Sequence, residues 1–132
     1  MDIQLYFEKN KGVGILSTAD INGEVNSAVY SKPHFLGNGY LSFIAHDKLT
    51  RNNLLSNPSA HYLFFEKGEG FKGVRVYMEK VEEIQDDSLI ESLSRRTKKK
   101  TDTSTSPRFL ISFRVKKVLT LVGDTELPVE FE

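Results

Sequence analysis

The sequence contains no cysteine, so the chain forms no disulfide bond, builds no thiolate metal site and has no cysteine nucleophile. It also lacks an excess of either charge, because 18 lysine and arginine residues balance 18 aspartate and glutamate residues. A chain without net charge has no overall field that favours nucleic acid or an acidic membrane. We therefore expect neither of these as a partner.

Long hydrophobic runs are missing as well. No run approaches the roughly 20 apolar residues that a membrane-spanning helix needs, and the first residues lack the basic region and apolar core of a signal peptide. These absences predict a soluble, cytoplasmic protein. With 132 residues and an ordinary apolar content of 39%, the chain is expected to form a single domain over residues 1–132.

The hydrophobic pattern predicts a mainly β protein. Runs of β-branched and aromatic residues are separated by turn signals such as Asn22-Gly23 and Gly37-Asn38-Gly39. The expected strands are Gly12–Ala19, Glu24–Lys32, Tyr40–Ala45, Ala60–Glu66, Val74–Ile84 and Arg108–Val122. Six strands joined mostly by hairpins favour an antiparallel barrel, whose closure would remove exposed strand edges.

Two to three short helices accompany these strands. The expected helices are Asp2–Lys9 and Asp47–Asn57, each capped by its first aspartate, and a helix that starts at Ser88 and ends at Leu93. Pro58 is expected to stop the second helix. Ser88 and Glu91 match a capping box for the third.

Alternation predicts which side chains of the two longest strands face the core. Over Val74–Ile84 it places Val74, Val76 and Met78 on one face. In the last strand, Phe109, Ile111, Phe113 and Val115 share a face, and Arg108, Ser112, Arg114 and Lys116 are expected on the other.

The helix expected after the third strand is a physically favourable place for a phosphate. Thr50, Arg51 and Asn52 fall in its first turns, where backbone N–H groups and the positive end of the helix dipole attract anions. An arginine there adds two parallel charge-assisted hydrogen bonds. The alternative interpretation is that Arg51 is a solvated helix residue paired with a nearby acid.

Other candidate motifs indicate no site. The histidines, His34, His46 and His61, do not have metal-ligand spacing, so no metal is expected. The basic cluster Arg95–Lys100 could bind nucleic acid, but the acidic stretch Glu79–Glu91 lies upstream, and a solvated exterior is the expected role.

Three segments, in order and spacing, resemble the pyridoxamine 5′-phosphate oxidase-like family, the FMN-binding split barrels. Gly14–Val25 is similar to the family's opening strand, turn and strand, and Ser27–Lys32 to the end of its second strand. Leu41–Ala60 resembles its strand, phosphate-binding helix and Asn-Pro stop. Phe71–Glu82 resembles a later strand, so the similarity covers most of Leu5 to Glu91. The resemblance predicts a six-stranded antiparallel split β-barrel with two to three short helices.

The resemblance also implies a homodimer with two FMN sites at the subunit interface. Carried over by position, the strand residues beside the flavin are Tyr30, Ser31, Lys32, Ala45 and His46. The helix residues at the phosphate are Thr50, Arg51 and Asn52, which Lys32 could assist. Because a flavin carries its own redox chemistry, no catalytic residue is assigned.

The chain departs from the true oxidases at its C-terminus, which lacks their Arg- and Trp-rich substrate segment. It is therefore not expected to be a genuine pyridoxamine phosphate oxidase. The leading hypothesis is a small FMN-dependent oxidoreductase acting with an unknown small-molecule substrate or electron donor. The alternative is a non-catalytic protein of the same fold that binds flavin, deazaflavin or haem for transport, storage or electron transfer.

Overall fold

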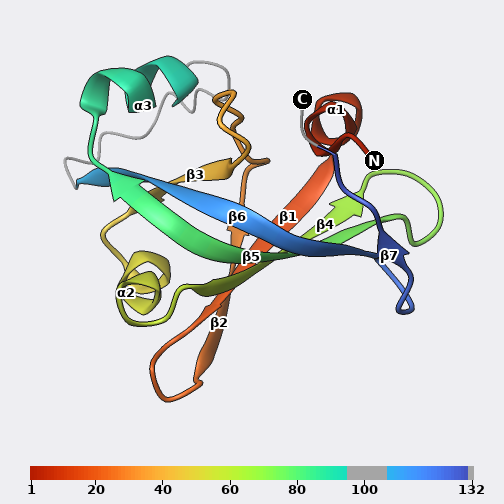
Figure 1. Ribbon diagram of the computed structural model, residues 1–132, viewed down its shortest axis with the longest axis horizontal. Coiled ribbons are helices and arrows are strands. Elements are labelled where there is room, and N and C mark those ends of the chain that lie inside the picture. The colour runs from red at the N-terminus through yellow and green to blue at the C-terminus, as the bar shows by residue number, and fades with distance from the viewer. Residues whose placement is uncertain (95–106, 131–132) are drawn as a thin grey trace.

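A computed structural model of the protein describes residues 1–94 and 107–130. Their ten elements match the sequence pattern closely (Figure 1). The strands are β1 (Gly12–Ala19), β2 (Val25–Tyr30), β3 (Leu41–His46), β4 (Ser59–Glu66), β5 (Gly73–Ile84), β6 (Arg108–Thr120) and β7 (Glu126–Leu127). The helices are α1 (Ile3–Lys9), α2 (Leu49–Ser56) and α3 (Asp87–Ser94).

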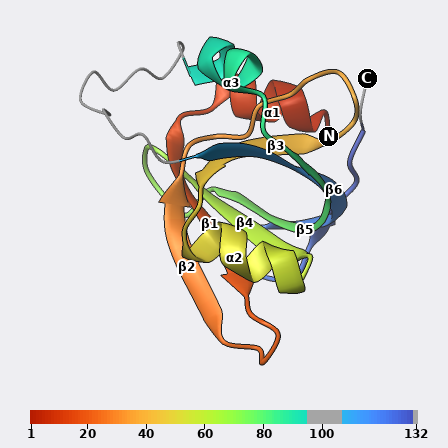
Figure 2. The ribbon, with the colours of Figure 1, turned by 90° about the vertical axis from the view of Figure 1, so that its left-hand side faces the viewer.

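The strands form one antiparallel sheet that curls into a barrel, as predicted (Figure 2). The order is β2-β1-β4-β5-β6-β3, and the short β7, which the sequence did not reveal, pairs with β6. Among the described residues the sheet does not close as the sequence pattern suggested, because its two end strands, β2 and β3, do not pair with each other. Backbone hydrogen bonds between His34 and Ser42 cover part of the β3 edge, so the opening is bordered mainly by β2.

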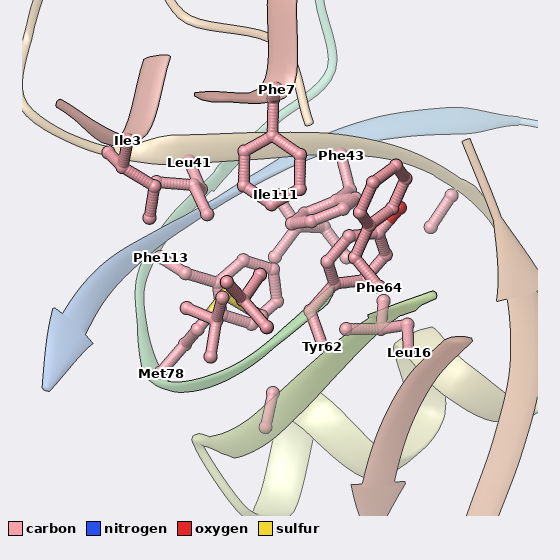
Figure 3. Packing of buried hydrophobic residues seen from close by; sticks show 14 of the residues in the cluster. Ile3, Phe7, Leu16, Leu41, Phe43, Tyr62, Phe64, Met78, Ile111 and Phe113 are labelled. Carbon is pink, nitrogen blue, oxygen red and sulfur yellow. The ribbon is translucent and has the colours of Figure 1, made fainter. Parts of the chain in front are cut away.

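The core fills the inside of the curled sheet (Figure 3). Phe7 projects into it from α1, with its ring edge-to-face against Phe64 at 5.3 Å and tilted against Tyr62 at 5.9 Å. Burying an aromatic side chain of this size stabilises the fold by about 1.5–3 kcal/mol. The predicted alternation of β5 is confirmed, since Val74, Val76 and Met78 are all buried.

The helix starts differ in part from the prediction. Asp2 caps α1 as expected, accepting a hydrogen bond from the Leu5 amide at 3.1 Å. In contrast, α2 begins two residues after Asp47, and its N-cap, Lys48, makes no side-chain cap. At α3, the carboxylate of Asp86 accepts from the Leu89 amide, so the predicted cap at Ser88 is wrong.

The predicted faces of β6 are only partly correct. Ser112 is buried although it was grouped with Arg108, Arg114 and Lys116 on the polar face, and Leu110, which was assigned to neither face, is buried as well. The reason is tertiary: α3 packs against β6, and the Ser112 hydroxyl forms a 2.7 Å hydrogen bond with Ser42 on the neighbouring strand β3. A second layer therefore covers the outside of β6 at this end.

Two further expectations from the sequence concern the basic cluster and membrane-spanning helices. The basic cluster Arg95–Lys100 lies outside the described residues. None of the helices in the described part of the chain is long and apolar enough to span a membrane.

Close approach at Gly14 fixes the position of β2 over the core. Gly14 pairs with Tyr30 of β2 and with Phe64 of β4. The Tyr62 hydroxyl passes next to Gly14 and donates to the carbonyl oxygens of Tyr30 (3.2 Å) and Ser31 (3.0 Å). A Cβ at position 14 would collide with the Tyr62 phenol, so only glycine leaves room for this contact.

We predict that Gly14→Ala destabilises the protein by about 1–3 kcal/mol, the usual cost of overpacking a well-packed position. Urea denaturation measures this change, with Lys11→Ala, an exposed position just before the same strand, as the control. Equal stability of Gly14→Ala and the control would contradict the role given to this contact.

Candidate functional site

The end of β3 leads directly into α2, as the phosphate prediction required. Ala45 is buried and pairs with Phe109 of β6. His46 ends the strand, and its carbonyl accepts a hydrogen bond from the Lys48 amide at 2.9 Å. One residue later α2 begins, without an acidic residue in its first turn and without a side-chain cap. Its first N–H groups thus have no side-chain acceptor from the cap.

Two polar contacts hold α2 against β1 and β2. The Asn53 amide donates to the Thr18 hydroxyl of β1 at 3.1 Å, and Thr50, which is buried, shares a side-chain hydrogen bond with Tyr30 of β2. Burial raises the pKa of Tyr30, and the bond to Thr50 only partly offsets this. The first turn of α2 is therefore fixed beside the C-terminal end of β2.

The strand β2 offers backbone groups on one edge. In the described part of the chain β2 pairs only with β1, so its other edge has no partner strand. Tyr30 packs against the core, edge-to-face with Phe43 at 6.3 Å, whereas Ser31 is exposed. An unpaired edge beside a helix N-terminus can supply N–H and C=O groups to a flat polar ligand.

Lys32 lies at a different contact from the one predicted. Its ammonium group donates to the carbonyl oxygens of Phe7 (2.8 Å) and Asn10 (3.0 Å). These carbonyls belong to the end of α1, where a cation is favoured by the helix dipole. Assistance to a phosphate would require Lys32 to leave both carbonyls, and the structure does not bring it together with Arg51.

Arg51 is bound to two carboxylates. Its Nε and Nη2 donate to Glu83 of β5 at 3.0 and 2.8 Å, and its Nη1 donates to Asp47 at 3.0 Å. The guanidinium carbon lies 3.8 Å from the centre of the Phe109 ring. The hydrogen bonds to Glu83, more than any other contact, hold the pKa of Arg51 above its usual value.

Asn52, the third helix residue that the resemblance placed at the phosphate, has no contact with the other predicted site residues in the described hydrogen bonds. Asn52 is exposed, and its backbone N–H donates to the carbonyl oxygen of Lys48 at 2.9 Å. Within the described residues, no group of three or more His, Asp or Glu side chains is arranged to hold a metal ion. The structure thus assembles Tyr30, Thr50 and Arg51 around the start of α2.

Sequence reasoning missed Glu83 and Phe109. Glu83 belongs to the acidic stretch that was interpreted as solvated exterior, yet its side chain is only 16% exposed. Phe109 was recognised as a core residue but not as the ring beneath Arg51. The interpretation of Arg51 as an arginine paired with nearby acid describes the observed contacts.

Comparison with solved structures identifies the fold that carries this arrangement of residues. No protein-family model and no curated protein matches the sequence, but solved structures do. An F420 reductase has a TM-score of 0.70 at 15% identity, over 86% of this chain and 93% of that chain. An FMN-binding protein from Syntrophomonas wolfei has a TM-score of 0.69 at 24% identity, over 90% and 83%.

A third structure, a putative pyridoxamine 5′-phosphate oxidase from Listeria innocua, has a TM-score of 0.65 at 17% identity. It is covered over 94% of its length, and 90% of this chain is matched. At such identities the likeness establishes the fold. The chain has the split-barrel fold of the pyridoxamine 5′-phosphate oxidase-like and FMN-binding proteins, as the sequence resemblance predicted.

The Arg51–Glu83 pair predicts a pH dependence. Hydrogen bonds from Arg51 lower the pKa of Glu83 below its ordinary 4.5, against the opposing effect of burial. Because the pKa of Glu83 is lower in the folded state than in the unfolded state, its ionised form stabilises the fold at every pH above the ordinary pKa. This contribution is lost as the pH falls through the folded-state pKa. Glu83→Gln should therefore cost about 1–2 kcal/mol at pH 7, and the difference from wild type should shrink towards pH 3.

Urea denaturation at several pH values measures this difference. The control is Glu79→Gln on the same strand, because Glu79 also accepts from an arginine, Arg114 at 2.8 Å, but with a 39% exposed side chain. Its effect should be at most a few tenths of a kcal/mol, as for exposed pairs. A Glu83→Gln effect that is independent of pH would show that the pair does not stabilise the fold through its charge.

Proposed function

We propose that this protein binds FMN at the start of α2, beside the free edge of β2, and uses it as a redox group for a small molecule. The observation that carries the proposal is the helix start without a side-chain cap, with Arg51 in its first turn, next to the edge of β2 that has no partner strand among the described residues. This donor set suits a phosphate joined to a flat ring with polar edges. Structural similarity to an FMN-binding protein and an F420 reductase supports it.

Each part of the chain has a distinct task in this proposal. Bound FMN would supply hydride transfer. The first N–H groups of α2 would hold the phosphate, in the same turn that carries Arg51. Backbone groups of β2 near Tyr30 and Ser31 would orient the ring, and the buried Ala45 would let it approach the strand end closely. No side chain is assigned to the chemical step.

A second copy of the chain is proposed to complete the site. The outer face of β1, β2 and β4 carries apolar side chains in register: Ile15 pairs with Val29 and Leu63, and Val13 pairs with Phe65. Val29 is 75% exposed and Val13 is 54% exposed. A hollow of about 570 Å³ lies over this face and is lined by residues of β1, β4 and the loop after β4. Such a contiguous apolar surface is typical of a subunit interface.

FMN titration tests the binding step. Adding the protein to FMN should quench the flavin fluorescence until FMN and chain are equimolar, because a ring held against protein leaves water. AMP, which carries a phosphate without a flavin ring, should not displace it at the same concentration. Flavin fluorescence that stays constant at protein concentrations of tens of micromolar would contradict the proposal.

The redox step has its own test on the loaded protein. NADH or NADPH should bleach the flavin absorbance under anaerobic conditions, and an added acceptor should restore it. Flavin that binds but is reduced by neither nucleotide would favour the non-catalytic alternative, a carrier or electron-transfer protein on the same fold.

Charge on the apolar face should break the proposed dimer. We expect Val29→Glu to convert the dimer to a folded monomer, because a carboxylate buried between subunits loses its hydration. Sedimentation velocity measures the change. The control is Ile21→Glu, since Ile21 is equally exposed but lies in the β1–β2 turn. A wild-type protein that is monomeric at high micromolar concentration would refute the interface.

A further inference from the structure

Three of the five N–H donors of Arg51 are bound to carboxylates of the protein itself. Glu83 takes the Nε and Nη2 donors in a bidentate pair, and Asp47 takes one from Nη1. Phe109 covers one face of the guanidinium plane. A phosphate would compete with Glu83 for the Nε–Nη2 edge, because both anions bind arginine through two parallel N–H···O bonds. The other edge is partly taken, since Asp47 already accepts from Nη1.

The charges around this contact are already balanced. The Nζ of Lys80 lies 3.7 Å from Oε1 of Glu83, which also accepts from Nε of Arg51. Arg51 and Lys80 therefore face Glu83 and Asp47 as two cations and two anions. Glu83 and Arg51 have side chains that are only 16% and 17% exposed. Limited water access makes the pair less screened than an exposed one. An incoming phosphate therefore meets a neutral cluster instead of a free cation.

We propose that Glu83 sets the cofactor preference of this site, by competing with the ligand's phosphate for Arg51. This inference rests on the proposed flavin site. While Glu83 holds Arg51, the phosphate contributes little, and the wild-type protein binds phosphorylated and unphosphorylated flavin with similar affinity. Removing the negative charge at position 83 releases Arg51 and creates a preference for the phosphorylated form.

Riboflavin and FMN are the two probes, because they share the ring and differ in the phosphate. The quantity measured is the ratio of the riboflavin Kd to the FMN Kd, obtained by fluorescence titration at pH 7.5. We expect a ratio near one for the wild type and a rise of about tenfold or more in Glu83→Gln, the scale of a hydrogen bond to a charged group. The riboflavin Kd itself should hardly change.

Two further variants separate competition from a general effect of charge. Glu79→Gln removes a carboxylate from the same strand, one that pairs with Arg114 instead, and should leave the ratio at the wild-type value. The double variant Arg51→Ala/Glu83→Gln should lose the gain of Glu83→Gln, because the phosphate then has no released guanidinium to bind. Glu83→Asp, which keeps the charge on a shorter side chain, should raise the ratio by less.

The outcomes distinguish this inference from the proposed function. If both flavins bind but Glu83→Gln leaves the ratio unchanged, or lowers it, the competition is refuted while the flavin site stands. The same holds if the double variant keeps the full gain. If no folded variant, judged by circular dichroism, binds either flavin, the proposed function and this inference fail together. Should Glu83→Gln not fold, an unchanged ratio in Glu83→Asp refutes the inference.

Discussion

The bidentate pair between Arg51 and Glu83 determines how the candidate site is built. It joins the first turn of α2 to β5 across 32 residues of sequence, and it holds the guanidinium over the Phe109 ring. Contacts from Thr50 and Asn53 fix the same helix to β2 and β1. Because α2 is tied to three strands, its N-terminal turn keeps one position at the open side of the barrel, where β2 has a free edge.

The open sheet and the short helices depend on each other. A closed barrel would pair β2 with β3 and leave no free backbone between them, whereas the observed sheet ends at these strands. Burial of Phe7 from α1 and Leu54 from α2 compensates for the missing closure by covering the core. Lys32 joins β2 to the end of α1. The fold thus lacks strand pairing between β2 and β3, and the proposed flavin site lies at this opening.

Local patterns in the sequence predicted most of the fold. Alternation identified the buried Val74, Val76 and Met78, and Asn22-Gly23 marked the β1–β2 hairpin, because these features depend on neighbouring residues. Partners distant in sequence were not predictable in this way. Ser112 is polar but buried through Ser42, 70 residues away, and the Lys32 ammonium is held by carbonyls 22 and 25 residues earlier. At the site, the pattern located Arg51 in the first turn of α2 but could not show that Glu83 holds it.

The central claim is that a flavin phosphate binds at the start of α2 in a two-subunit assembly. A crystal structure of the protein grown with saturating FMN tests it most directly. This claim predicts two copies packed through β1, β2 and β4, with the phosphate on the first N–H groups of α2 and Arg51 still paired with Glu83 beside it. A flavin phosphate bound elsewhere, or a single subunit whose α2 contacts no anion, would contradict it.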